Sequence, residues 1–161
     1  MHPNVSRVVQ AAEAQGLAIE VRRFPEGTRT AADAARAVGC EVGQIVKSLV
    51  FVADDRPLLA LVSGANRVDL AKLAAAAGAR AARRADGDEA RAATGFAIGG
   101  VPPFGHPSPT TVLVDRDLTA HEVVWAAAGL PDAVFAVRPA DLLRASGGVV
   151  ADLADEATGR R

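Results

Sequence analysis

A lysine within an apolar strand is the first residue whose setting points to chemistry. The segment Gln44 to Val52 is rich in β-branched and aromatic residues and predicts a strand, in which Lys47 shares a face with Ile45 and Leu49. Burying an unpaired ammonium is costly, so Lys47 serves Schiff-base chemistry, binds an anion, or reaches the rim with its charged end. Nothing in the sequence indicates the lowered pKa that a Schiff base needs. Binding of a phosphate or carboxylate is therefore the most economical functional role.

The second candidate feature is a loop rich in glycine and proline, Phe96 to Pro109. It holds three of the fifteen glycines and four of the nine prolines of the chain. Residues such as Gly99 and Gly100 permit positive φ and the close approach of a ligand, whereas Pro103 fixes its own backbone. A loop of this kind presents N–H groups to a carbonyl or carboxyl oxygen, although the same composition also occurs in ordinary surface loops.

The usual catalytic groups are scarce. The histidines His2, His106 and His121 show no metal-ligand spacing, and the single Cys40 excludes an internal disulfide and a cysteine-based zinc site. No serine lies in a Gly-x-Ser-x-Gly context, so we expect no serine hydrolase, no metal and no cofactor. His106 follows the loop and could line a pocket, and Asp115 ends a predicted strand beside it. A solvent-facing histidine and a turn-initiating aspartate are the simpler interpretations of the same two residues.

The whole chain limits the class of protein. With 161 residues, half of them apolar, it fits one domain spanning 1–161. A formal charge of -1 gives no global attraction to nucleic acid, so any such contact needs a local patch. The sequence shows no charged-then-apolar leader and no apolar run of membrane-spanning length, and it has one cysteine. We therefore expect a cytoplasmic protein with no membrane partner.

Caps, turns and periodicity predict the elements. Thr30 and Asp86 are expected N-caps, each followed three residues later by an acidic residue, and either Asn66 or Asp69 begins an alanine-rich helix. The uneven order of hairpins and helices predicts an α+β domain with a curled, largely antiparallel, barrel-like mixed sheet surrounded by helices. Helices are expected over 4–15, 30–38, 66–77, 86–94 and 139–145, and strands over 18–23, 44–52, 58–62, 80–84, 111–115, 123–127, 133–137 and 149–153.

Two stretches together resemble the YbaK-like family of aminoacyl-tRNA deacylases, which is related to the editing domain of bacterial prolyl-tRNA synthetases. They are the lysine strand Gln-Ile-Val-Lys-Ser-Leu-Val with its hairpin, and the later Thr-Gly-Phe-Ala-Ile-Gly-Gly-Val-Pro-Pro-Phe-Gly-His. The likeness runs from about Val5 to Asp152. It implies the editing-domain fold and a hydrolase that acts on the acceptor end of a mischarged tRNA without a protein nucleophile. It also implies prolyl-tRNA synthetase as a possible partner.

The resemblance also assigns roles to residues. Lys47 matches the family lysine that holds the phosphate near the terminal adenosine. Gly99 and Pro103 match the ends of the Gly-x-x-x-Pro loop, whose backbone positions the aminoacyl ester. The substrate-binding residues expected beside them are Phe24, Ser48, Gly100, His106 and Asp115.

One departure from the family concerns specificity. Members that remove cysteine carry a polar turn and an acidic residue where this chain has Ala127-Ala128-Gly129 and Val134. This favours another small amino acid, such as alanine, serine, threonine or 2-aminobutyrate, on tRNA for proline. Two alternatives stay open: a catalytically silent module that binds tRNA or a synthetase, and a hydrolase of small aminoacyl esters or amides. Solvated faces are the simpler interpretation of Arg22, Arg23, Arg80, Arg83 and Arg84, which could otherwise contact phosphates.

Overall fold

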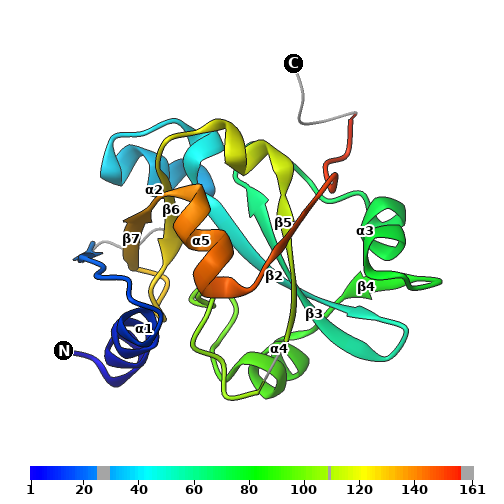
Figure 1. Ribbon diagram of the computed structural model, residues 1–161, viewed down its shortest axis with the longest axis horizontal. Helices are drawn as coiled ribbons and strands as arrows, with labels where there is room; N and C mark the ends of the chain where they lie inside the picture. Colours follow the sequence, from blue (N-terminus) through cyan, green and yellow to red (C-terminus); the bar gives the residue numbers. More distant parts are fainter. Residues whose placement is uncertain (25–29, 109, 157–161) are drawn as a thin grey trace.

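The computed structural model describes residues 1–24, 30–108 and 110–156 (Figure 1). Helices and strands alternate unevenly along the chain, as the cap and turn residues predict. The elements are α1 (Pro3–Ala14), β1 (Val21–Arg23), α2 (Ala31–Val38), η1 (Val42–Gln44), β2 (Val46–Ala53), β3 (Arg56–Ser63), α3 (Leu70–Ala77), β4 (Ala82–Arg84), α4 (Gly87–Thr94), β5 (Thr111–Asp115), η2 (Arg116–Ala120), β6 (Val124–Ala127), β7 (Ala133–Val137), α5 (Pro139–Ser146) and β8 (Val149–Ala151).

The strands of the described residues form two sheets. The smaller has the order β1-β7-β6 and is antiparallel throughout. The larger has the order β4-β2-β3-β5-β8, in which β4, β2 and β3 are antiparallel, whereas β3, β5 and β8 run parallel. In Figure 1 the smaller sheet lies beside α1 and α2, and α3 and α4 lie on the side of the larger sheet.

The larger sheet is covered on both faces. Its first face, with Val50, Leu59 and Val112, packs against the smaller sheet and α1 in a continuous apolar core. Its second face, with Phe51 and Leu113, packs against α3. The central strand β3 is therefore buried on both faces from Leu58 onward, which explains why its sequence is a continuous apolar run without alternation.

Local signals in the sequence account for most element ends. Thr30 and Asp86 each form the predicted capping box, with Asp33 and Glu89, and Gly39 and Gly95 end those helices in the left-handed conformation. Asp69, not Asn66, caps α3. The first helix is capped by the His2 ring, whose Nδ1 accepts the N–H of Asn4, so the prediction of Asn4 or Ser6 as the cap is wrong.

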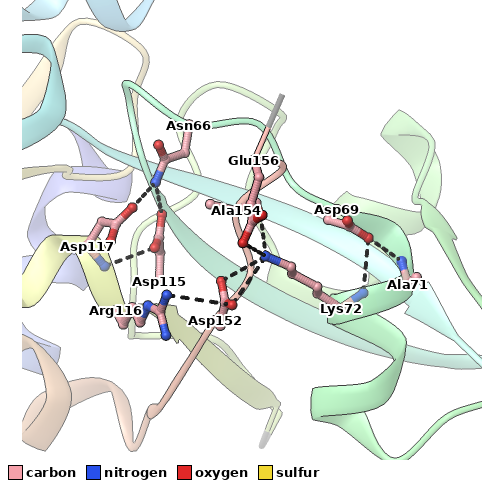
Figure 2. A network of polar contacts seen from close by, with 10 residues as sticks. All are labelled: Asn66, Asp69, Ala71, Lys72, Asp115, Arg116, Asp117, Asp152, Ala154 and Glu156. Atoms are coloured by element: carbon pink, nitrogen blue, oxygen red, sulfur yellow. Dashed lines mark hydrogen bonds and ion pairs between the residues drawn. The ribbon is translucent and has the colours of Figure 1, made fainter. Parts of the chain in front are cut away.

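The segment after β8 is fastened to the body by a lysine. The Lys72 ammonium donates to Asp152 at 3.2 Å and to the carbonyl of Ala154 at 2.9 Å, and it forms an ion pair with Glu156 (Figure 2). Leu153 and Ala154 beneath these contacts are fully buried. Lys72, the second lysine of the chain, therefore has a structural role.

The predicted α+β class is confirmed, with two refinements. The strands divide between two open sheets instead of closing into a barrel, and two of the strand pairs are parallel. The sequence analysis predicted a mixed sheet but did not locate its parallel pairs, because parallel pairing joins segments far apart in the chain and leaves no turn signal. No helix in the described part of the chain has the length and apolar character needed to cross a bilayer.

Candidate active site

A cavity of about 300 Å³ lies along the outer edge of β2, where the two sheets meet. The short strand β4 pairs with β2 only at residues 51–53, so within the described residues no strand of the larger sheet covers 46–50. The backbone of this edge forms one wall, and successive residues of β2 therefore all touch the cavity. Its lining is Thr30, Ala31, Ala34, Ile45, Val46, Lys47, Ser48, Leu49, Val50, Arg84, Ala85, Ala90, Ile98, Gly99, Val101, Trp125, Ala126, Ala127, Pro131 and Val134.

Lys47 provides the cavity with a cation that no carboxylate of the described residues contacts. Its ammonium donates a hydrogen bond to the main-chain carbonyl oxygen of Asn66, which is neutral. Burial lowers the pKa of Lys47 from its ordinary value, the charge of Asp115 opposes that shift, and the charges of Arg84 and Arg67 add to it. An ammonium that is hydrogen-bonded but not neutralised is suited to receive an anionic ligand.

Arg84 extends this positive charge along the cavity. Its neighbour Arg83 forms a bidentate pair with Glu89, with N–O distances of 2.8 and 2.7 Å, and so belongs to the scaffold. Arg84 points the other way, lines the cavity, and stacks its guanidinium 5.8 Å from the centre of the Phe51 ring. The sequence treats the two arginines alike, and the structure gives only Arg84 a place in the site.

The smaller sheet supplies an apolar wall. Ala127 and Val134 are cross-strand partners on β6 and β7 and both line the cavity, which gives a structural meaning to the departure noted in the sequence. Trp125 lies on the same face of β6 and pairs with Ile45 through an isolated bridge that joins the two sheets. Arg22 on β1 is the cross-strand partner of Val134 and projects on the same face, where its guanidinium lies 5.0 Å from the centre of the Trp125 ring.

Ser48 is the expected site residue with the most unusual surroundings. It lines the cavity, and its hydroxyl oxygen is buried without a hydrogen-bond partner among the described residues. A buried unpaired hydroxyl costs about 1 to 3 kcal/mol. This combination of an unpaired hydroxyl and a position in the cavity wall makes Ser48 a residue to test by mutation.

The glycine-proline loop reaches the cavity through a tight turn. The N–H of Gly100 donates to the carbonyl of Ala97 at 3.0 Å, and Gly99 within the turn has a φ of +93° and lines the cavity. Gly100 has a different constraint, because a Cβ there would lie 2.9 Å from Leu130 Cα. The N–H of Gly99 has no acceptor among the described residues and is available to an oxygen of a ligand.

The later part of the loop is scaffold instead of lining. Pro103 is buried, and Phe104 packs 5.7 Å from Phe135, so this segment anchors the turn to the core. His106 does not line the cavity, and its Nε2 lies 2.8 Å from the carbonyl oxygen of Pro102, within hydrogen-bond distance. Burial lowers the pKa of His106, and the nearby Arg7 adds to the shift. Pro109, the last residue of the predicted loop, lies outside the described residues.

Phe24 and Asp115 are also absent from the lining. Phe24 is half-buried at the end of β1, and its backbone N–H donates to the carbonyl of Asp132 at 2.9 Å. Asp115 is fully buried and accepts hydrogen bonds from the Ser63 N–H and from the amide of Asn66. Of the eight expected site residues, the cavity lining contains Lys47, Ser48 and Gly99, whereas Gly100 and Pro103 belong to the same loop but do not line the cavity.

The residues that sequence reasoning missed are mainly apolar. Trp125 and Ile98 carry no motif, and only the strand register and the loop conformation bring them to the cavity. Ala127 and Val134 were detectable only as departures from a family pattern.

The described residues offer little for metal or thiol chemistry. Among them, no group of three or more His, Cys, Asp and Glu side chains is placed to hold a metal ion. The lining contains none of these four residue types, and burial together with Glu41 raises the pKa of Cys40, which lies outside the lining. The cavity therefore supplies positive charge, backbone N–H groups and an apolar wall.

Comparison with known proteins identifies the family of this chain. The sequence model of the aminoacyl-tRNA editing domain matches residues 25–145. A solved structure of a candidate trans-editing enzyme for prolyl tRNA synthetase superposes with a TM-score of 0.91 at 49% identity, covering 96% of this chain and 99% of the other.

Curated relatives agree with this likeness. The uncharacterised protein YwhH of Bacillus subtilis is 30% identical over 124 residues, which are 76% of this chain and 78% of YwhH. EbsC of Enterococcus faecalis, a candidate Cys-tRNA(Pro)/Cys-tRNA(Cys) deacylase, is 26% identical over 131 residues, 81% of this chain and 80% of EbsC. The chain belongs to the aminoacyl-tRNA editing domain family, and its class of activity is deacylation of aminoacyl-tRNA.

Proposed function

We propose that this protein is a trans-editing deacylase that hydrolyses the ester of tRNA for proline carrying a small, non-cognate amino acid with an apolar side chain. The observation that carries the proposal is the cavity itself. Its lining includes Lys47, the Gly99 turn and the apolar pair Ala127 and Val134, and this combination supports the proposal. The similarity to a trans-editing enzyme for prolyl tRNA synthetase supports the choice of tRNA for proline, and makes that synthetase the expected partner.

The nucleophile comes from outside the protein. Ser48 has no hydrogen-bond partner that could act as its base, and the Thr30 hydroxyl is engaged by the N–H of Asp33 as a helix cap. A water molecule therefore attacks the ester carbonyl, and one of its protons ends on the ribose oxygen that leaves. The bond between the carbonyl carbon and the ribose oxygen breaks, and the amino acid and free tRNA leave.

The site stabilises the reacting ester by charge and backbone donors. Lys47 and Arg84 hold the phosphate of the terminal nucleotide at the mouth of the cavity. The Gly99 N–H is a donor for the oxyanion that develops on the carbonyl, and one such donor contributes about 3 to 4 kcal/mol in other acyl-transfer enzymes.

The apolar wall sets the choice of amino acid. Neither Ala127 nor Val134 offers a hydrogen bond to a thiol or hydroxyl, so the wall favours alanine and 2-aminobutyrate over cysteine and serine. The cavity is at the small end of the range for ligand sites, which excludes bulky side chains.

The decisive experiment measures release of labelled amino acid from tRNA for proline charged with alanine, 2-aminobutyrate, cysteine, serine or threonine. We expect release of alanine or 2-aminobutyrate by the wild type and loss of most of it in Lys47→Ala. Lys72→Ala is the matched control and should retain activity, because within the described part of the chain the Lys72 ammonium contacts only the segment after β8. Stable charging of every tRNA in the presence of folded protein would overturn the proposal.

A further inference from the structure

The charged end of Lys47 depends on one backbone atom. Among the described residues its hydrogen-bond partner is the carbonyl oxygen of Asn66, which lies between β3 and α3 and not in a regular element. A carbonyl in a connecting segment is a poor anchor unless the segment is itself fixed. The position of the Lys47 ammonium therefore depends on the contacts that hold Asn66 in place.

Asn66 is held on several sides. The residue is 3% exposed, and its side-chain amide nitrogen donates to the carboxylates of Asp115 and Asp117, both at 2.8 Å (Figure 2). Its backbone N–H donates to the carbonyl of Ser63 at 2.9 Å. Two side-chain hydrogen bonds to charged acceptors and one to the backbone leave the peptide of residue 66 little freedom.

Asp115 ties this segment to the end of the neighbouring strand β5. One of its carboxylate oxygens accepts the N–H of Ser63 at 3.0 Å as well as the Asn66 amide, and the other accepts the N–H of Asp117 at 3.0 Å. The carboxylate is fully buried, and no cation of the described residues contacts it. A buried polar network of this kind is rigid when every member is paired.

The arrangement requires asparagine at position 66. An aspartate of the same shape would bring a third carboxylate against Asp115 and Asp117 and would donate nothing. An alanine would leave both carboxylates without the amide donor. Neither the helix cap nor the cavity lining needs this side chain, since Asp69 caps α3 and Asn66 lies outside the lining.

We infer that Asn66, clamped by Asp115 and Asp117, is the positioning residue that fixes the Lys47 ammonium at the mouth of the cavity. The inference rests on the proposed function for the reaction that Lys47 serves, but the positioning itself is measurable without any tRNA. It also gives Asp115 a role in the site, because Asp115 holds Asn66 and does not itself contact the substrate.

The test uses the fact that Lys47 and Lys72 are the only lysines. In protein labelled with ¹³C-lysine and carrying Lys72→Arg, the Lys47 side chain gives a single set of signals. We expect its two ε protons to have separate shifts in the otherwise unchanged protein. In Asn66→Ala and in Asn66→Asp the two shifts should merge, as in a freely rotating lysine. If Asn66→Ala does not fold, Asn66→Ser keeps one hydrogen-bonding group and should give an intermediate separation.

The matched control is Asp69→Ala, which weakens the same segment by removing the α3 cap but does not touch Asn66. Equal changes of the Lys47 signals in Asn66→Ala and Asp69→Ala would overturn the inference, because they would show general loosening. Unchanged signals in Asn66→Ala would overturn it as well.

Kinetics provide the second arm. We expect Asn66→Ala to lower kcat/KM for deacylation by about tenfold or more, and to have little effect when added to Lys47→Ala. Additive losses would contradict a role through Lys47. If the wild type deacylates no tRNA, the proposed function fails, while the lysine signals still decide whether Asn66 positions Lys47.

Discussion

Ala127 and Val134 face each other across β6 and β7, and together they form the part of the cavity wall that faces the edge of β2. Side chains paired across antiparallel strands lie close enough to act as one surface. Any enlargement of either residue therefore takes space directly from a bound side chain. Under the proposed function, we expect this pair to decide which amino acid enters the cavity.

Ala127→Val is expected to narrow the cavity. Deacylation of tRNA carrying 2-aminobutyrate should fall by about tenfold or more, whereas deacylation of the alanyl form should change less, because one methylene is worth about 1 to 3 kcal/mol in such a pocket. The measurement is kcat/KM for both substrates. Ala136→Val is the control, since Ala136 is exposed on β7 and does not line the cavity. An equal loss of kcat/KM for both substrates would show that Ala127 and Val134 do not determine which amino acid is accepted.

Gly99 and Gly100 are expected to respond differently to substitution. A Cβ at Gly99 meets nothing closer than Pro131 Cγ at 3.7 Å, so the cost of Gly99→Ala comes from its φ of +93° and not from crowding. Asparagine tolerates positive φ better than alanine, so Gly99→Asn should lower the free energy of unfolding less than Gly99→Ala. At Gly100 both substitutions should be poorly tolerated, because a Cβ there would lie 2.9 Å from Leu130 Cα. Denaturant unfolding of the four variants measures these free energies of unfolding. If asparagine were better tolerated than alanine by the same amount at both positions, this explanation would be contradicted.

The charge of Arg84 is expected to tune Lys47. A neighbouring cation disfavours the protonated ammonium, so Arg84→Gln should raise the pKa of Lys47, and Asp115→Asn, which removes an attractive charge, should lower it. Titration of the ¹³C-labelled Lys47 side chain measures both shifts. Arg83→Gln is the control, because Arg83 pairs with Glu89 and does not line the cavity. A larger shift in Arg83→Gln than in Arg84→Gln would be inconsistent with the site.

Much of this arrangement could be predicted from the sequence, and the features that could not be predicted were missed for physical reasons. Capping boxes such as Thr30 with Asp33 are local, so the sequence located them. Lys47 was detectable as a charge in an apolar row, and Gly99 was detectable from the glycine-proline composition of its loop and from the family motif. Arg83 and Arg84 were not separable, since their roles differ only in the face of β4 from which each projects. The role of Asn66 depends on a contact with β5, which is distant in the chain.

Acidification is expected to weaken the glycine-proline loop through His106. Its pKa is lowered in the folded protein, so the unfolded chain binds the proton more readily and stability falls as pH drops below the ordinary value of about 6.5. The loss ends once the pH lies below the lowered, folded-state pKa. The effect is measured by comparing the unfolding free energies of the wild type and His106→Gln between pH 7.5 and pH 5. All other titratable groups are the same in the two proteins, so their contributions cancel in the comparison. A variant as sensitive to pH as the wild type would show that His106 does not carry it.

Ser48→Ala is expected to separate stability from activity. Removing a buried, unpaired hydroxyl should raise the free energy of unfolding by about 1 kcal/mol, because the folded protein no longer holds an unsatisfied group. Ser63→Ala is the matched control and should change stability in the opposite direction, since the Ser63 hydroxyl donates to the carbonyl of Gly43 at 2.8 Å. If the Ser48 hydroxyl finds its partner in the bound aminoacyl group, Ser48→Ala should also deacylate more slowly than the wild type. Greater stability with unchanged kcat/KM would show that the hydroxyl has no part in binding the substrate.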